Sequence, residues 1–275
     1  MNHGFTVIAD DVIDLRKIAE SGQCFRWTEM MGGFHIPHRE KDVLVKQIDP
    51  YRIWLSCTEE EYAGIWKSYF DLDESYDAIC AGITREKDPF LYEAIRDQHG
   101  IRILKQDFWE MLITSIITQN RNIPAIKKSV MLLSEKAGSK RESVCGGFFY
   151  SFPTPSQLAH MSDEDLSDCK LGYRTKYVRA AACAVDSGNI DMEAIRGMSD
   201  DECERLLISL PGVGVKVTSC AMLFGLHRLN AFPIDVWVKR ILQDEYPNGY
   251  PRNEYSPYNG LFQQYMFEYY RKQHS

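Results

Sequence analysis

The amino-acid sequence predicts an α+β fold in which an N-terminal, antiparallel and twisted β-sheet domain is followed by an all-helical domain. Two observations predict this order. Short segments rich in aromatic and β-branched residues, separated by turn signals, fill the chain up to about residue 75. Longer segments with apolar residues at helical spacing follow them. We therefore expect residues 1–85 to form the sheet domain and residues 86–275 to form the helical domain.

The first segments have the composition of β-strands. Turn signals stand between them at Met31–Gly33, at Arg39–Asp42 and at Asp49-Pro50. Because each turn is short, consecutive segments can pair only as antiparallel neighbours, which predicts a meander. The predicted strands are QCFRWTEM, GGFHIPHRE, KDVLVKQID and YRIWLSC.

The later segments carry the start signals of helices. Asp88 stands before Pro89, and Asn122 stands two residues before Pro124, so each pair places a capping side chain ahead of a proline in the first turn. Segments such as QDFWEMLITSIITQ, KYVRAAACAVDSG and DDECERLLISL keep the helical spacing. The second unit is therefore predicted to be helical throughout.

Composition and cysteine spacing exclude several classes of protein. With 275 residues, 44% of them hydrophobic, the chain can bury two compact cores. It has no apolar run near the roughly 18 residues of a membrane span, and acids occupy the N-terminal stretch where a signal peptide would be apolar. We expect a monomer in the cytoplasm, or in the nucleus of a eukaryote, with no membrane partner. The eight cysteines form no CxxC pair, which predicts reduced thiols and argues against a zinc site or an iron–sulfur cluster.

The net charge of −7 is unfavourable for binding nucleic acid, but the charge is unevenly distributed. Residues 98–140 contain seven basic and three acidic side chains, residues 170–179 four basic and no acidic ones, and residues 210–240 four basic and one acidic. These windows carry +4, +4 and +3, so the rest of the chain carries −18. One basic face on an acidic body suits an enzyme that visits nucleic acid.

The segment LPGVGVK joins two predicted helices through a turn with two glycines. Gly212 and Gly214 permit backbone angles that other residues avoid. A helix, a tight turn and a second helix form a hairpin whose exposed N–H groups and positive helix end suit a phosphate oxygen. Taken alone, however, the motif fits an ordinary glycine-capped turn between helices at least as well, so both interpretations stay open.

Lys216 lies in the first turn of the second helix, on the same face as Cys220. Most residues around it are apolar, so the lysine is either a surface residue at the helix end or an amine in a partly desolvated pocket. A cation near a helix N-terminus is disfavoured by about 0.3–1 kcal/mol. Such a position increases the fraction of neutral, nucleophilic amine.

Asp235 follows Pro233 and Ile234 and precedes the helical segment VWVKRIL. Its simplest role is an N-cap, which stabilises a helix by about 1 kcal/mol. A carboxylate fixed at a helix start can also face a developing positive charge, provided that the hairpin brings Lys216 near it. Neither residue is specific alone, but the combination indicates covalent catalysis.

The hairpin, Lys216 and Asp235 together resemble motifs of the helix-hairpin-helix DNA glycosylases, and specifically of the 8-oxoguanine DNA glycosylases, a branch without an iron–sulfur cluster. Four further motifs occur in matching order: SGQCFRW, ITQNRNIPAI, LGYRTKYV and GLFQQYMFEYY. The resemblance implies a bifunctional DNA glycosylase and AP lyase that needs no cofactor. Its partner would be double-stranded DNA containing 8-oxoguanine.

The resemblance also implies which residues recognise the base. The backbone carbonyl of Gly22 would accept the N7 hydrogen that distinguishes 8-oxoguanine from guanine. Phe267 and Cys220 would sandwich the base, and Gln263 would read its pairing edge. The base must first be rotated out of the duplex, at a cost of a few kcal/mol.

Other residues are implied to contact the DNA. Asn120 and Tyr173 would occupy the gap left by the extruded base, and Arg174 would contact the base opposite. Gly212 and Gly214 would let the hairpin approach the DNA backbone. In many members of the family a monovalent cation binds hairpin carbonyls that correspond to those of Ile208, Leu210 and Val213.

The implied chemistry has two steps. Lys216 attacks C1′ while Asp235 stabilises the oxocarbenium-like sugar as the glycosidic bond breaks. The resulting Schiff base then permits β-elimination of the 3′ phosphate.

The sequence departs from well-known members of the family at three positions. Ala125 replaces a second arginine that touches the opposite cytosine, so only Arg174 is left for that task and weaker preference for cytosine is expected. Trp237 replaces a histidine two residues after the aspartate, and it either contacts a phosphate or fills space. Arg121 replaces the middle asparagine of a run of three and is expected to contact the DNA backbone.

Two alternatives remain at this level. The chain could be a glycosylase for a different oxidised or alkylated base, or a helix-hairpin-helix binding module without catalysis. In the binding module Lys216 would contact a phosphate and Asp235 would only cap a helix. Covalent trapping on lesion-containing DNA with borohydride separates the enzyme from the module.

Overall fold

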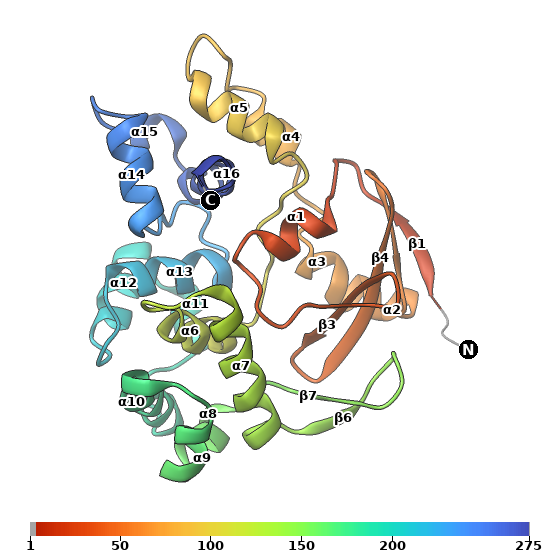
Figure 1. The fold of residues 1–275 in the computed structure, drawn as a ribbon, viewed down its shortest axis with the longest axis vertical. Coiled ribbons are helices and arrows are strands. Elements are labelled where there is room, and N and C mark those ends of the chain that lie inside the picture. The colour runs from red at the N-terminus through yellow and green to blue at the C-terminus, as the bar shows by residue number, and fades with distance from the viewer. Residues whose placement is uncertain (1–3, 275) are drawn as a thin grey trace.

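The computed structural model describes residues 4–274 and confirms the α+β organisation. In Figure 1 the sheet lies to the right and most helices lie to the left. One antiparallel sheet has the strand order β1-β5-β4-β3-β2. Its strands are β1 (Phe5–Ile8), β2 (Thr28–Met30), β3 (Gly33–His38), β4 (Lys41–Asp49) and β5 (Arg52–Leu55).

Strand β4 is the centre of the sheet. Its Val45 is paired with Phe34 of β3 and with Leu55 of β5. Side chains on the covered face, such as Ile36 and Ile53, are fully buried, as expected for a sheet with one face on a core. The predicted meander from β2 to β5 is confirmed, whereas the sequence did not reveal that β1 pairs with β5 at the edge.

The strand predicted over QCFRWTEM is shorter than expected. Only Thr28–Met30 pairs with β3. Gln23 explains the difference, because its buried side chain hydrogen-bonds Arg102 and Leu104, far along the chain. The preceding short helix α1 (Leu15–Glu20) was also missed by sequence reasoning.

Three short helical segments follow the sheet and cover it. They place Trp66 and Phe70, both fully buried, against the sheet residues. These segments are α2 (Glu59–Glu61), η1 (Tyr62–Trp66) and α3 (Lys67–Tyr69).

The helical part has two hydrophobic clusters. One surrounds α6 and includes residues of α7, α10, α12 and α13. The other surrounds α16 and includes residues of α4, α5, α14 and α15. The helices are α4 (Tyr76–Cys80), α5 (Pro89–Asp97), α6 (Phe108–Ile117), α7 (Ile123–Ala137), α8 (Pro155–Ala159), α9 (Asp163–Asp168), η2 (Gly172–Arg174), α10 (Thr175–Asp186), α11 (Ala194–Gly197), α12 (Asp200–Ile208), α13 (Val215–Gly225), α14 (Val236–Asp244), α15 (Arg252–Tyr255) and α16 (Asn259–His274).

The helical part is not helical throughout. A β-hairpin of β6 (Lys140–Glu142) and β7 (Phe148–Tyr150) interrupts it. The hairpin points toward the sheet, where the Asp42 carboxylate accepts hydrogen bonds from Ser143 Oγ at 2.6 Å and from Val144 N at 3.1 Å. Contact with another part of the chain thus fixes this element, which is why local patterning did not predict it.

Helices α6 and α13 pack against each other in antiparallel directions. Gly225 at the end of α13 lies so close to Phe108 at the start of α6 that a Cβ would come within 3.0 Å of it. At the other end, Lys216 in the first turn of α13 contacts Thr118, just after α6. The pair therefore brings the start of α13 and the segment after α6 together at one end.

The cysteines share a common chemical state. All eight are free thiols, and Cys183 is exposed. Burial raises the pKa of the other seven, for example to about 12 in Cys24 and to about 11 in Cys203. The seven are Cys24, Cys57, Cys80, Cys145, Cys169, Cys203 and Cys220.

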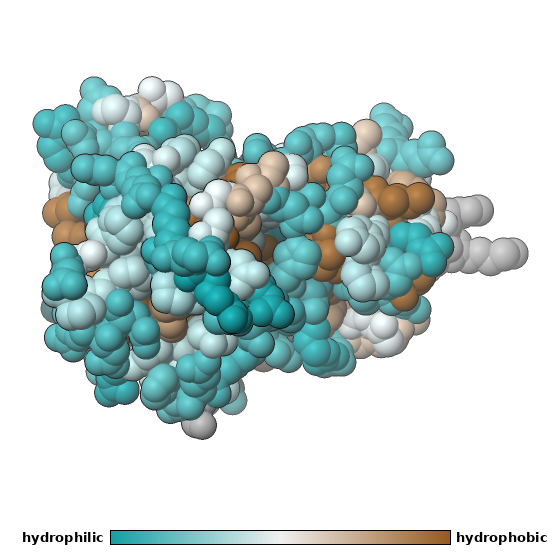
Figure 2. Space-filling view, turned by 90° about the horizontal axis from the view of Figure 1, so that it is seen from above, coloured by the Kyte–Doolittle hydropathy of each residue, from teal (hydrophilic) through white to brown (hydrophobic). Residues whose placement is uncertain are grey.

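The surface seen from above consists of a larger and a smaller lobe with a hollow between them (Figure 2). Most of this face is hydrophilic, and some hydrophobic residues show in the hollow. Among residues 4–274, no helix has the length and apolar character that a membrane span requires.

Candidate active site

The turn between α12 and α13 has the geometry of a tight hairpin. Gly212 has φ +75°, and a Cβ at this position would lie 2.2 Å from the ring of Tyr177. Only glycine fits there. Gly214, in contrast, caps α13 with an ordinary extended backbone, φ −107° and ψ 179°, so it does not use the angles that glycine permits. Its exposed Cα leaves open space in which a Cβ would contact nothing.

The two glycines are expected to respond differently to alanine. Gly212→Ala should lower the free energy of unfolding by more than about 2 kcal/mol, because the left-handed backbone and the Tyr177 ring both oppose a methyl group. Gly214→Ala should change it by less than about 0.5 kcal/mol. It should still weaken DNA binding by about tenfold if a phosphate approaches this backbone. Thermal unfolding measures the stability and fluorescence anisotropy measures DNA binding. Equal stability of both variants would contradict the conclusion that only glycine fits at position 212.

Lys216 is half-buried, and its amine has a defined partner. Its Nζ donates to Thr118 Oγ1 at 3.0 Å, and that hydroxyl donates in turn to the Ser115 carbonyl at 2.7 Å. Because Thr118 uses its proton on Ser115, its oxygen is free to accept from the amine. The structure therefore favours the pocket interpretation of Lys216 over that of a surface lysine.

The thiol of Cys220 is influenced by both Lys216 and Asp235. Burial raises the pKa of this thiol, the charge of Lys216 and a hydrogen bond from it lower that pKa, and the charge of Asp235 raises it. Both charged groups thus act on one buried sulfur. The catalytic hypothesis requires Lys216 and Asp235 to share a pocket, and their common influence on Cys220 is consistent with that requirement.

Asp235 is the N-cap of α14. Its Oδ1 accepts a hydrogen bond from Val238 N at 2.9 Å, which confirms the predicted cap. The predicted caps Asp88 and Asn122 are confirmed as well. Capping uses one carboxylate oxygen of Asp235 and holds the group in place.

The residues assigned to the base come from three distant parts of the chain. Gly22, with φ +73°, faces α16, and a Cβ on it would lie 4.0 Å from the ring of Phe267. One turn earlier on α16, Gln263 is buried, and its Oε1 has no hydrogen-bond partner within residues 4–274. A buried, unpaired amide oxygen costs about 1–3 kcal/mol. A ligand with a hydrogen-bond donor would remove this cost.

The residues assigned to the DNA gap lie on the segment after α6 and on η2. Asn120 is exposed and has φ +49°. Arg174 is only 6% exposed, and its guanidinium donates to the carbonyls of Gln119 at 2.8 Å and of Asn120 at 3.2 Å. Tyr173 is 52% exposed, with Arg174 over its ring at 4.3 Å. Arg174 thus holds the Asn120 turn through its guanidinium.

The three positions that depart from the family pattern lie around these segments. Arg121 is half-buried and donates to Ser129 Oγ at 2.9 Å. Burial and the nearby charge of Arg174 lower the pKa of Arg121. Ala125 lies in the first turn of α7 and offers only a methyl group. Trp237 packs edge-on against Tyr270 of α16, with ring centroids 6.4 Å apart.

The distribution of ion pairs is consistent with a DNA-binding surface. In the three basic windows, five cations pair with carboxylates, namely Arg102, Lys105, Lys136, Arg179 and Arg228. Other cations of these windows belong to no ion pair within residues 4–274. They are Arg121, Lys127, Lys128, Lys140, Lys170, Arg174, Lys176, Lys216, Lys239 and Arg240. Apart from Lys216, these side chains follow Asn120, surround Tyr173 and follow Asp235, so unpaired positive charge accompanies each predicted contact segment.

Two residues near the lysine were missed by sequence reasoning. Thr118 holds the amine, and Gln119 donates to the Gly212 carbonyl at 3.1 Å, which ties the segment after α6 to the hairpin. Both residues lie within the motif ITQNRN, but the resemblance assigned a role in that motif to Asn120 alone. The contacts follow from the antiparallel packing of α6 on α13, which the sequence does not specify.

Outside the region of Lys216, the molecule could offer two other kinds of site, a metal site or a cavity. Among residues 4–274, no group of three or more His, Cys, Asp or Glu side chains could hold a metal ion. A cavity of about 690 Å³ lies at the opposite end of α13, lined by residues such as His38, Lys105 and Gly225. It contains none of the residues assigned to catalysis or to the base.

Comparison with protein families identifies the class and then the family. Residues 113–250 match the model described as "HhH-GPD superfamily base excision DNA repair protein". The fold and site are therefore those of a helix-hairpin-helix base-excision repair protein. Residues 6–112 match the "8-oxoguanine DNA glycosylase, N-terminal domain". The chain belongs to the 8-oxoguanine DNA glycosylases of this superfamily.

Individual relatives are consistent with this assignment. A solved structure of Clostridium acetobutylicum 8-oxoguanine glycosylase/lyase, bound to double-stranded DNA with cytosine opposite 8-oxoguanine, is 33% identical, covers 100% of both chains and has a TM-score of 0.89. A probable N-glycosylase/DNA lyase of Methanothermobacter thermautotrophicus is 26% identical over 94% of each chain. The N-glycosylase/DNA lyase of Saccharomyces cerevisiae is 31% identical over 65% of this chain, which spans only 50% of the yeast protein.

Proposed function

We propose that this protein is a DNA glycosylase and AP lyase that removes 8-oxoguanine from duplex DNA and then cleaves the strand. The observation that carries this proposal is the half-buried Lys216 amine, held by Thr118 Oγ1 at 3.0 Å, and the charge of Asp235 acts together with that of Lys216 on the buried thiol of Cys220. A nucleophilic amine beside a carboxylate is the pair that displacement of a base from a sugar requires.

Access to the base requires that the nucleotide leave the helix. Unstacking and unpairing cost a few kcal/mol. The exposed ring of Tyr173 and the exposed side chain of Asn120 offset this cost by occupying the vacated space. The unpaired cations on α7, near Tyr173 and on α14 bind the phosphates and fix the register.

The extruded base lies between Phe267 and Cys220 in this proposal. The Gly22 carbonyl accepts the N7 hydrogen of 8-oxoguanine, whereas guanine presents a lone pair there and is rejected. The unpaired Oε1 of Gln263 supports this arrangement, because a donor on the pairing edge of the base would satisfy it. Discrimination between the two bases thus rests on the Gly22 carbonyl, because the pairing edge that Gln263 reads is the same in both.

The chemistry begins with the neutral amine of Lys216, whose lone pair attacks C1′. The glycosidic electrons leave with the base, and the Asp235 carboxylate stabilises the positive charge that develops on the sugar. Loss of a proton and ring opening give a Schiff base between Nζ and C1′. Removal of a C2′ proton then expels the 3′ phosphate by β-elimination, and hydrolysis of the imine regenerates the amine.

Opposite-base selectivity is expected to be weak. Ala125 cannot donate a hydrogen bond, and Arg174 already donates to the carbonyls of Gln119 and Asn120. Excision rates with A, C, G and T opposite the lesion should therefore agree within about tenfold, because one bidentate contact contributes about 1–3 kcal/mol of discrimination. Single-turnover assays on four duplexes measure this.

The matched variant for this prediction is Ala125→Arg. It should raise the preference for cytosine by about fivefold or more if a guanidinium at this position reaches the opposite base. Lys128→Arg, an exposed change on the same helix, should leave the preference unchanged. Strict selection of cytosine by the unmodified protein would contradict the prediction.

Three finer features belong to the same proposal. A monovalent cation would bind the carbonyls of Ile208, Leu210 and Val213, although Leu210 O already accepts from Val213 N at 3.1 Å. If so, replacing K⁺ with a large organic cation should weaken DNA binding. The protein acts as a monomer, which sedimentation tests, and it works in the compartment that holds the DNA, which imaging of a tagged chain tests.

The lesion itself is tested with duplexes that differ in one base. The protein should incise 8-oxoguanine opposite cytosine at least about a hundredfold faster than guanine or an alkylated purine at the same position. Preferential release of an alkylated base would assign a different substrate. Binding without any excision or covalent trapping would assign a DNA-binding module.

A further inference from the structure

The loop that carries Gly22 is fixed from both sides by glutamine side chains. On one side, Gln264 of α16 donates to the Ser21 carbonyl at 2.6 Å and is 2% exposed. On the other side, Gln106 donates to the Gln23 carbonyl at 2.9 Å. The carbonyls immediately before and after that of Gly22 are therefore held by donors from two distant segments.

Gln23 adds a third attachment through its own side chain, which is fully buried. Its Nε2 donates to the Arg102 carbonyl at 2.9 Å, and its Oε1 accepts from Leu104 N at 2.9 Å. The same Nε2 lies 2.9 Å from Ser21 Oγ. The Gln23 side-chain amide thus donates to and accepts from the backbone of the connector between α5 and α6, as a neighbouring β-strand would.

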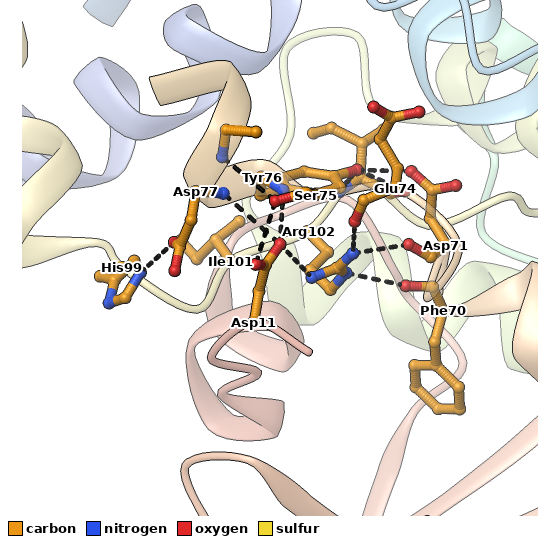
Figure 3. Close-up of polar contacts among 12 residues, drawn as sticks. Asp11, Phe70, Asp71, Glu74, Ser75, Tyr76, Asp77, His99, Ile101 and Arg102 are labelled. Atoms are coloured by element: carbon orange, nitrogen blue, oxygen red, sulfur yellow. Dashed lines mark hydrogen bonds and ion pairs between the residues drawn. The ribbon is translucent and has the colours of Figure 1, made fainter. Parts of the chain in front are cut away.

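The connector is itself rigidly anchored by the buried side chain of Arg102 (Figure 3). Its guanidinium donates to the carbonyls of Phe70 at 3.2 Å and of Asp71 at 2.6 Å. It also lies 3.7 Å from the Asp11 carboxylate and over the Tyr76 ring at 4.2 Å. A buried arginine with this many partners holds its backbone in one place.

We propose that Gln264 and Gln23 are positioning residues that aim the Gly22 carbonyl at the base and so set the discrimination between 8-oxoguanine and guanine. This inference rests on the proposed function. Gly22 lies at φ +73° next to the Phe267 ring, and glycine alone does not restrain its own peptide groups. Hydrogen bonds weaken steeply as the donor angle departs from linearity. Small rotations of this loop would therefore remove the contact with N7.

The arrangement exceeds what packing requires. Leucine or methionine would fill the volume of a buried glutamine without the cost of burying an amide. Gln264 is adjacent to Gln263, and Phe267 lies one turn further along α16. The helix that carries two of the base-pocket residues thus also holds the loop that carries the third.

Gln264→Met tests the inference, because it keeps the size of the side chain and removes the donor to Ser21. Single-turnover excision of 8-oxoguanine should fall by about 10- to 100-fold. β-Elimination at a preformed abasic site, which needs no base recognition, should stay within about twofold. In the Lys216→Gln background, the binding preference for 8-oxoguanine over guanine should fall by about tenfold.

A matched control is Tyr255→Phe on α15. It removes a buried hydrogen bond to Asp88 at 2.8 Å in the cluster around α16, while Tyr246 still donates to that carboxylate at 2.9 Å. This variant should leave excision and binding preference unchanged at a similar loss of stability. Gln23→Leu should reproduce the effect of Gln264→Met if it folds.

The outcomes separate the two hypotheses. Unchanged excision and preference in Gln264→Met would overturn the positioning role, as would an equal loss of excision and of abasic-site elimination. If the unmodified protein traps abasic DNA but does not release 8-oxoguanine, the proposed substrate is wrong and the inference falls with it. If Gln264→Met lowers excision and the binding preference but retains abasic-site elimination, both the proposed function and the positioning role are supported.

Discussion

Lys216→Gln is expected to abolish covalent trapping on abasic or 8-oxoguanine DNA and to lower β-elimination by at least about a thousandfold. Glutamine is only one bond shorter than lysine, and it keeps an N–H donor on the side of Thr118, which the lysine contacts at 3.0 Å. It has no nucleophilic lone pair, so no Schiff base forms. Borohydride reduction followed by denaturing electrophoresis measures the adduct directly.

The control for this experiment is Lys128→Gln, which removes an exposed cation of α7. Its adduct yield at saturating DNA should equal that of the unmodified protein, although its affinity at high salt should fall slightly. If Lys216→Gln still gave a full yield of adduct, another amine would be the nucleophile and the assignment of the pocket would be wrong.

Asp235→Asn is expected to separate the two roles of this residue. Asparagine caps helices as well as aspartate does, so the hydrogen bond from Val238 N at 2.9 Å is retained and the melting temperature should hardly change. The negative charge is lost, and with it the stabilisation of the sugar cation. Loss of one such electrostatic contact costs about 100- to 1000-fold in rate, which single-turnover excision measures.

Asp235→Ala provides the comparison. It removes the charge and the cap together, so it should lose about 1 kcal/mol of stability in addition to the activity. A thermal scan of both variants distinguishes the two contributions. Activity of the asparagine variant near that of the unmodified protein would leave Asp235 as a cap with no chemical role.

Local patterning predicted those parts of the fold that local physics controls. The caps Asp88 and Asn122 and the strands β3 to β5 follow from short-range signals, and the structure contains them. Strand β1, helix α1 and the β6–β7 hairpin depend on partners far along the chain. The extended backbone of Gly214 also escaped prediction, because the sequence cannot distinguish a glycine needed for its angles from one that only leaves space.

The candidate site likewise contains residues that local signals predicted and residues that they did not. Lys216 and Asp235 could be argued from helix ends and from chemistry, and the charges of both act on the buried thiol of Cys220. Gly22, Gln263 and Phe267 have no local signature and were found through resemblance alone. The hydrogen bonds of Gln23 and Gln264 span up to 243 positions of sequence, so no pattern in a single chain reveals them.

The buried state of the cysteines has a consequence for survival under oxidants. Peroxide reacts with thiolates rather than thiols, and burial raises the pKa of seven of the eight cysteines, including Cys220, one helical turn after Lys216. Few of these groups are ionised at neutral pH. A protein that repairs oxidised DNA must work when peroxide is abundant, and the protonated thiol of Cys220 reacts slowly with peroxide.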